Sequence, residues 1–218
     1  MKSQSNDGGG TTWILTEGDS LTSVPEEFME AITPEIRAAF ENPQAYFLAL
    51  AEQLSCRSLS RWIRDLIADG GWRLMVADTY MMERSVLAGF RWSCPTNSGV
   101  ILQPGSGSDD PQSIFHQLRW IHWYQVAWSG GLYRPGHRPT LKRYGMETSI
   151  LGYAPEDCEV CGNTSDGDVF VLTPDDNGAF LSHENLKSYR LGNEAEMWEW
   201  VFGELRNRRE PEFDYSRV

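Results

Sequence analysis

Residues 167–205 constrain the fold more than any other part of this chain. Val169–Leu172 is a short run of residues that favour strands. The following sequence, Pro-Asp-Asp-Asn-Gly at 174–178, is typical of a tight turn, because proline sets φ while Asn and Gly tolerate positive φ. Residues 179–182 can then return as a second strand. The pattern predicts a β-hairpin.

The apolar spacing changes after this hairpin. From residue 194 onwards, large apolar residues recur three and four apart, as on one face of an amphipathic helix: Met197, Trp198, Val201, Phe202 and Leu205. Asn193 is a suitable N-cap, and Glu194 and Glu196 would lie in the electropositive first turn. A hairpin followed by a covering helix forms a small packing unit, and no catalytic signature occurs in it.

Helical patterns dominate residues 20–70. Ser23, Thr33 and Pro43 each stand where a helix can begin. Residues 45–54 and 58–68 both have an apolar stripe, and the second of these segments turns its arginines to water. We therefore expect three or four short helices before Gly70-Gly71. Residues 72–80 and 85–92 are richer in strand-forming residues, although 81–84 can also continue a helix.

The middle of the chain alternates between loops and aromatic segments. Residues 104–111 are rich in Gly, Ser and Asp and are expected to be a linker or exposed loop. Residues 114–128 hold five aromatic side chains, which we interpret as a core helix ending at Gly130-Gly131, or alternatively as a stacking platform for bases. A basic, turn-rich segment (133–145), a strand (147–153) and an acidic loop (155–162) should follow.

These elements predict an α+β fold, in which a helical N-terminal region precedes an antiparallel or mixed sheet with covering helices. The expected division is a disordered tail (1–12), a helical region with possible strands (13–104), an α+β region (105–205) and a second tail (206–218). A length of 218 residues, with 40% hydrophobic residues and nine Trp, is sufficient for a sizeable core.

Charge is distributed unevenly along the chain. The net charge is −12; residues 151–205 hold twelve acidic and two basic residues, whereas residues 57–150 have a net charge of +4. An acidic C-terminal part repels phosphate, which argues against direct binding of nucleic acid and favours a basic protein partner. The alternative interpretation is a solvated acidic surface. No apolar run is long enough to span a membrane, and the polar start of the chain predicts a cytoplasmic protein.

Cys158 and Cys161 have the spacing of half a zinc site. A structural zinc needs four ligands, and the other candidates are isolated in the sequence: Cys56, Cys94, His137 and His183. A redox pair would need a helix N-terminus to lower the thiol pKa, but the sequence around these cysteines is acidic. We therefore regard Cys158 and Cys161 as weak metal candidates and expect no cofactor.

The histidines form no recognisable catalytic motif. His116 and His122 are six residues apart, which does not place them on one helical face. His183 and Glu184 are adjacent, so their side chains would point apart. A catalytic nucleophile and base could still be contributed by segments that are distant in the sequence. The enzyme alternative is therefore a hydrolase with its site between the N-terminal helices and the C-terminal sheet.

The C-terminal third resembles the SUKH superfamily, a mixed α+β fold found in many bacterial toxin-immunity proteins. The resemblance rests on residues 167–172, the turn at 175–178, residues 180–184 and the helix at 198–205. Upstream, residues 118–131 resemble the family's opening helix. The resemblance implies a protein without enzymatic activity that binds and neutralises a toxin, often a nuclease.

An acidic surface would suit such a partner, because it can occupy the phosphate-binding cleft of a basic toxin. The expected partner-binding carboxylates are Asp157, Glu159, Asp166, Asp168, Asp175, Asp176 and Glu184. Besides the immunity protein and the hydrolase, a third hypothesis is a nucleic-acid or metal-dependent module that uses the basic stretch 119–143 and the cysteine pair.

Overall fold

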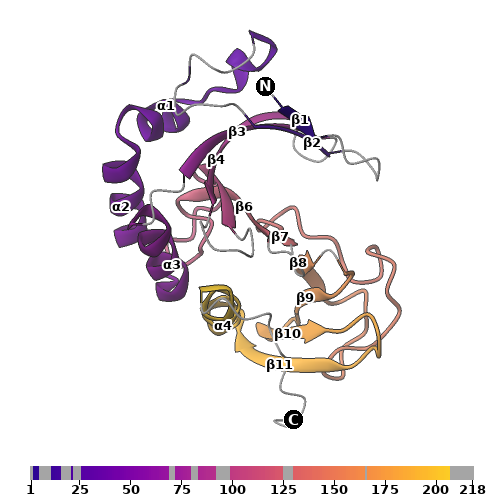
Figure 1. The fold of residues 1–218 in the computed structure, drawn as a ribbon. Helices are drawn as coiled ribbons and strands as arrows, with labels where there is room; N and C mark the ends of the chain where they lie inside the picture. Colours follow the sequence, from indigo (N-terminus) through magenta and orange to yellow (C-terminus); the bar gives the residue numbers. More distant parts are fainter. Residues whose placement is uncertain are drawn as a thin grey trace.

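A computed structural model describes residues 2–4, 11–15, 21, 26–68, 72–79, 83–91, 99–124, 130–164 and 166–206. It shows the expected α+β fold. Within these residues the strands form one antiparallel sheet of eleven strands, in which each strand pairs with its neighbours in the sequence. Figure 1 shows this sheet curving from β1 at the top to β11 at the bottom, with α1, α2 and α3 along one side.

In the described residues, two strands are followed by four helices, nine further strands and a last helix. The helices are the 3₁₀ helix η2 (Glu26–Ala31), α1 (Pro34–Glu41), α2 (Pro43–Gln53), α3 (Arg57–Ala68) and α4 (Glu194–Arg206). The strands are β1 (Lys2–Gln4), β2 (Thr11–Leu15), β3 (Trp72–Thr79), β4 (Glu83–Arg91), β5 (Gly99–Pro104), β6 (Leu118–Tyr124), β7 (Gly130–Leu132), β8 (Glu159–Thr164), β9 (Val169–Leu172), β10 (Asn177–Leu181) and β11 (Ser188–Asn193).

Two of the expected helix starts, at Thr33 and Pro43, are confirmed, whereas Ser23 lies outside the described residues. The Thr33 hydroxyl accepts a hydrogen bond from the amide of Ile36, and the Asn42 side chain accepts one from the amide of Ala45, each over 3.3 Å. Proline follows each cap, where its missing N–H costs nothing. The expected strands at 72–80 and 85–92 are also confirmed as β3 and β4, which pair with each other.

One large core lies between the four α-helices and one face of the sheet. Trp62 of α3, Phe170 of β9 and Trp198 of α4 are fully buried within it. This core includes residues from both the expected 13–104 and 105–205 regions, and β5 pairs with β6 across that boundary. The two regions therefore share one sheet and one core.

A second, smaller core covers the other face of β8, β9 and β10. Val160, Val169 and Leu181 point to this side, because side chains alternate between the two faces of a strand. They are covered by residues of the connection between β7 and β8, including Leu141 and Ile150. We call the connection at 133–158 the covering segment.

The prediction of a helix at 114–128 is wrong. Leu118–Tyr124 is β6, which pairs with β5 and β7, and Gly130 begins a strand instead of ending a helix. Ile121 and Trp123 are both buried in the main core, which is the period of two expected for a strand. Aromatic residues favour strands as well as buried helices, so the composition did not separate the two cases. Trp128 and the segment 125–129 lie outside the described residues.

Four further segments differ from expectation. Residues 188–193, for which the sequence predicted no strand, form β11. Residues 147–153 contain a single bridge between Ile150 and Tyr153 and no strand. The loop expected at 155–162 ends where β8 begins, at Glu159. Lys2–Gln4 and the first two residues of Thr11–Leu15 lie in the expected disordered tail but belong to strands, whereas the rest of Thr11–Leu15 lies in the region where strands were thought possible. The remainder of that tail and residues 207–218 lie outside the described residues.

The loop at 104–111 is confirmed, and its acidic residues Asp109 and Asp110 are exposed. Across the described parts of the chain, we find no helix with the length and apolar character needed to cross a membrane.

Candidate partner-binding site

The β9–β10 hairpin presents two of the expected carboxylates at its tip. The turn is closed by the Thr173 hydroxyl, which accepts a hydrogen bond from the amide of Asn177 over 3.2 Å. Asp176 adopts the left-handed conformation, with φ of 57°, a role that the sequence had suggested for Asn177 or Gly178. A Cβ atom at Gly178 would lie 3.0 Å from that of Met197, so this glycine instead allows α4 to approach.

The seven expected carboxylates divide into two groups at opposite ends of the strands. Glu159 is opposite Leu172 in the β8–β9 pair, which places it near the tip of the β9–β10 turn. At the other end, Leu181 is opposite Val169. We call Asp157, Glu159, Asp175 and Asp176 the turn-end group, and Asp166, Asp168 and Glu184 the far-end group. Four strand residues separate them, which is about 13 Å.

Two of the four members of the turn-end group, Asp175 and Glu159, already have partners. The Tyr153 hydroxyl donates to the Asp175 carboxylate, and this hydrogen bond raises the pKa of Tyr153. Glu159 lies 3.8 Å from the Arg138 guanidinium. Asp157 and Asp176 are exposed, and neither makes a side-chain ion pair with a residue that the structure describes. They are the two carboxylates at this end that are free to meet a partner.

Arg138 belongs to the basic segment proposed above for nucleic acid, but its charge is used internally. Its side chain is 5% exposed and binds Glu194 at the start of α4, while Nε donates to the backbone oxygen of Tyr133 over 3.3 Å. Burial alone would lower the pKa of Arg138, but the hydrogen bond to Glu194 and the nearby carboxylates raise it. Lys142 in turn lies 3.7 Å from Glu156. The structure therefore does not present these two cations as a free basic platform.

One carboxylate of the far-end group, Asp168, is paired with His183. His183 Nδ1 lies 2.7 Å from Asp168 Oδ1, and the same oxygen accepts the His183 backbone N–H over 2.9 Å. The side-chain hydrogen bond raises the pKa of His183. The carboxylate partner of His183 is thus Asp168 and not the adjacent Glu184, as the alternation of side chains had indicated. A protonated His183 would offset part of the negative charge at this end.

Cys158 and Cys161 point to opposite faces of the sheet. Cys158 is buried with Val160 in the second core, whereas Cys161 is buried in the main core and its thiol donates to the backbone oxygen of Phe170 over 3.3 Å. They are three positions apart, and their membership of different cores shows that the two side chains lie on opposite faces. Burial raises the pKa of both thiols. This pair therefore cannot ligate one metal ion together.

The other proposed ligands do not join them. Cys56 is buried at the start of α3, where its sulfur accepts from the amide of Leu59 over 3.5 Å and burial raises the thiol pKa to about 12. Cys94 lies outside the described residues. Among the residues that the structure describes, no group of three or more His, Cys, Asp or Glu side chains is arranged to hold a metal ion.

The space between the helices and the sheet, where a hydrolase site was considered, is filled by the apolar core. Trp62 and Phe202 lie 6.2 Å apart there, and Phe170 contacts Trp198 with ring centroids 5.9 Å apart. Within the described part of the chain, Thr164, Thr173 and Ser182 are the polar residues that are buried as whole residues, and they lie at the ends of β8, β9 and β10.

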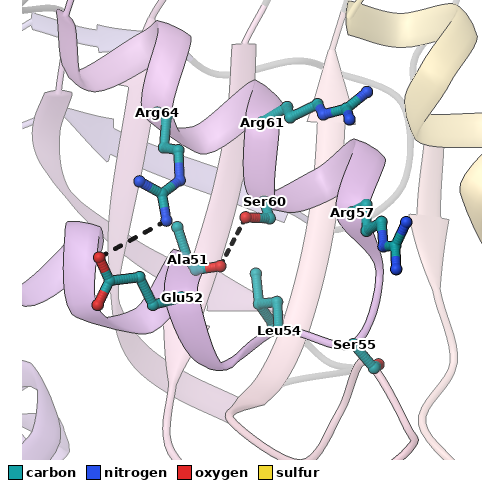
Figure 2. Close-up of a pocket in the computed structure, with 8 residues that line it drawn as sticks. All are labelled: Ala51, Glu52, Leu54, Ser55, Arg57, Ser60, Arg61 and Arg64. Carbon is teal, nitrogen blue, oxygen red and sulfur yellow. Dashed lines mark hydrogen bonds and ion pairs between the residues drawn. The ribbon is translucent and has the colours of Figure 1, made fainter.

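Sequence reasoning missed a pocket between α2 and α3. Figure 2 shows its lining residues: Ala51, Glu52, Leu54, Ser55, Arg57, Ser60, Arg61 and Arg64. The available signal was the spacing of the three arginines, which are four and three residues apart and so share one helical stripe.

Comparisons of this chain with models of known protein families, with curated proteins and with solved structures found no match.

Proposed function

We propose that this protein is a SUKH-like immunity or interaction protein that binds and neutralises a basic protein toxin, such as a nuclease, through its turn-end group. The observation that carries the proposal is the position of Asp157 and Asp176, which are exposed together at one end of the sheet without a cation of their own in the described structure. The proposal places the protein in the cytoplasm and requires no cofactor.

The turn-end group has the physical properties that such binding needs. Negative charges held on short turns of a sheet attract a positively charged partner and speed the encounter. Tyr153 lies beside Asp175 and is half-buried, and tyrosine at the centre of an interface often contributes much of the binding energy. The tight turn that holds Asp176 also limits the conformational entropy lost on binding.

The proposal now concentrates on four of the seven carboxylates. At the far end, Asp168 is engaged with His183, which weakens the negative potential there. The family resemblance is likewise used only for the β9–β10 hairpin and α4. The segment that resembled an opening helix contains β6 and β7, so no part of the proposal depends on it.

The test is capture of a basic partner with the immobilised protein. Extract from the source cell is applied, bound proteins are eluted with salt and identified, and the binding of the purified partner is measured by calorimetry. A toxin encoded beside this gene is the expected partner. The double variant Asp157→Asn/Asp176→Asn should weaken binding about tenfold, because each carboxylate contributes a charge-assisted contact. Asn tolerates the positive φ at position 176.

Two control variants remove the same number of charges elsewhere. Asp109→Asn/Asp110→Asn changes an exposed loop between β5 and β6 and should leave the affinity unchanged apart from a small effect of net charge. Asp166→Asn/Glu184→Gln tests the far-end group. Equal weakening by all three variants would show that net charge alone matters, and stronger weakening by the far-end variant would contradict the proposed surface. Loss of protection of the toxin's substrate should accompany the loss of binding.

A further inference from the structure

The pocket between α2 and α3 is positively charged, although the protein as a whole carries a net charge of −12. Three arginines of α3 line it, and Glu52 of α2 is the one acidic residue among the described lining residues. The apolar side of α3, including Leu59, is buried in the main core. The arginines are therefore held on the outer side of a helix whose position is set by packing.

The backbone amides at the start of α3 are not part of this positive charge. The Glu199 carboxylate of α4 accepts hydrogen bonds from the amides of Arg57 and Ser58, the latter over 2.9 Å. The serine hydroxyls of the pocket are also engaged: Ser60 donates to Ala51 O over 2.6 Å and Ser55 donates to Gln112 O over 2.7 Å. What the pocket offers a ligand is its guanidinium groups.

A carboxylate already lies at one of these groups. Glu52 Oε1 is 3.7 Å from Arg64 Nη2, and the Glu52 side chain is 68% exposed. Such an exposed, long ion pair contributes little to stability. Figure 2 shows that Arg57 and Arg61 extend away from this pair, and within the described part of the chain neither side chain makes an ion pair. Arg64 is therefore weakly engaged by Glu52, and the guanidinium groups of Arg57 and Arg61 are available to a ligand.

We propose that this pocket binds a carboxylate-rich segment of a partner protein, independently of the proposed toxin binding. Arginine forks bind carboxylates through two parallel hydrogen bonds. Arg57 and Arg61 are about 6 Å apart along the helix axis, and Arg57 and Arg64 about 10 Å. Acidic side chains two residues apart in a strand, or four apart in a helix, are also about 6 Å apart and so match the spacing of Arg57 and Arg61.

The shape and the overall charge favour a peptide segment over the other anions that arginine binds. The pocket is shallow and open, whereas sites for small molecules enclose most of the ligand surface. A nucleic acid extends beyond the pocket and carries a charge at every phosphate, so it would meet the repulsion of a protein with a net charge of −12. A short acidic segment meets this repulsion over a smaller area.

The test is to titrate the 218-residue protein into fluorescein-labelled octaglutamate at low salt and to measure binding by the change in fluorescence anisotropy. Wild-type protein should bind the peptide, and added salt should weaken the binding because the contacts are exposed. The variant Arg57→Gln/Arg61→Gln should weaken binding about tenfold through the loss of two charge contacts. Glu52→Gln should strengthen binding about twofold, because it removes the carboxylate that competes for Arg64.

A matched control is Arg37→Gln/Arg143→Gln, which removes two exposed arginines from α1 and the covering segment and should leave the affinity within about twofold. Circular dichroism checks that each variant is folded. Labelled octathymidylate, with nearly the same charge, tests the nucleic-acid alternative. The proposal is overturned if wild-type protein does not bind the peptide, if the two double variants behave alike, or if octathymidylate binds more tightly than the peptide.

Discussion

Arg138 and Glu194 join two parts of the chain that are 56 residues apart: Arg138 Nη1 donates to Glu194 Oε2 over 3.2 Å, and Nη2 binds the other carboxylate oxygen. The carboxylate also accepts the indole N–H of Trp198 over 3.0 Å. Through this contact the covering segment is attached to the first turn of α4. The same segment contributes Leu141 and Ile150 to the second core and carries Tyr153 and Asp157 of the turn end, so this contact links both to α4.

We expect Arg138→Met to lower the free energy of unfolding by about 3 kcal/mol, because removing one partner leaves a partly buried carboxylate uncompensated. Urea unfolding followed by tryptophan fluorescence measures the change. Arg143→Met, at an exposed position of the same segment, is the control and should cost less than about 0.5 kcal/mol. Equal effects of the two substitutions would show that the Arg138–Glu194 contact does not stabilise the fold.

The pKa of His183 should depend on Asp168. Its hydrogen bond to Asp168 raises the pKa above 6.5, so Asp168→Asn should bring the pKa back towards that value. NMR titration of the imidazole signals measures it. Glu184→Gln removes one charge without removing the hydrogen bond and should have a smaller effect.

The same hydrogen bond determines the sign of a stability effect. Because the folded-state pKa of His183 is raised, its contribution to stability is fully present below pH 6.5 and is lost as the pH rises through the folded-state pKa. Asp168→Asn should therefore destabilise the protein more at about pH 6 than at about pH 9. Destabilisation that is the same at both pH values would contradict this coupling.

His122 of β6 should make the protein sensitive to acid. Burial lowers its pKa to about 4 from 6.5, so the unfolded chain binds a proton in this range while the folded protein does not. Stability from this group is complete above pH 6.5 and falls by up to about 3 kcal/mol as the pH is lowered to 4. Unfolding measured at a series of pH values should show a flatter profile in His122→Gln than in wild type. Parallel profiles would exclude His122 as the source.

Glu199 should stabilise α3 although it belongs to α4. Its carboxylate accepts the first amides of α3, as an N-cap side chain does, and Glu199→Ala should cost about 1–2 kcal/mol. Chemical unfolding measures this cost. Glu204→Ala, in the same helix, is the matched control, for which we expect less than about 0.5 kcal/mol. An equal loss from both substitutions would contradict a specific role of Glu199 as the cap of α3, because alanine does not lower helix propensity.

Elements with a local signature were predicted well from the sequence. In α4, Asn193 Oδ1 accepts from the amide of Glu196, and Glu196 Oε2 accepts from the amide of Asn193, both over 2.9 Å. This capping box lies within four consecutive residues and can be recognised before any fold is known. The β9–β10 hairpin was equally local, because its turn residues and both strands lie within thirteen residues.

Elements whose structure depends on residues far away in the sequence were not predicted well. Residues 118–124 have a composition that fits a buried helix or a strand, and their pairing with β5 and β7 decided the outcome. Residues 188–193 became β11 because β10 offers them an edge to pair with. The roles of charged residues were also hidden: Arg138 looks like any other arginine of a basic segment until Glu194 is placed beside it.

The sequence by itself determined the helices of the first third, the hairpin at 169–181, the last helix and the surplus of acidic residues, because each depends on spacing or composition within a short window. Only the tertiary structure decided that the acidic residues divide between two ends of a sheet, that Cys158 and Cys161 lie on opposite faces, and that the arginines of α3 line a pocket. These properties depend on strand register and on contacts between residues far apart in the chain, which no local pattern encodes.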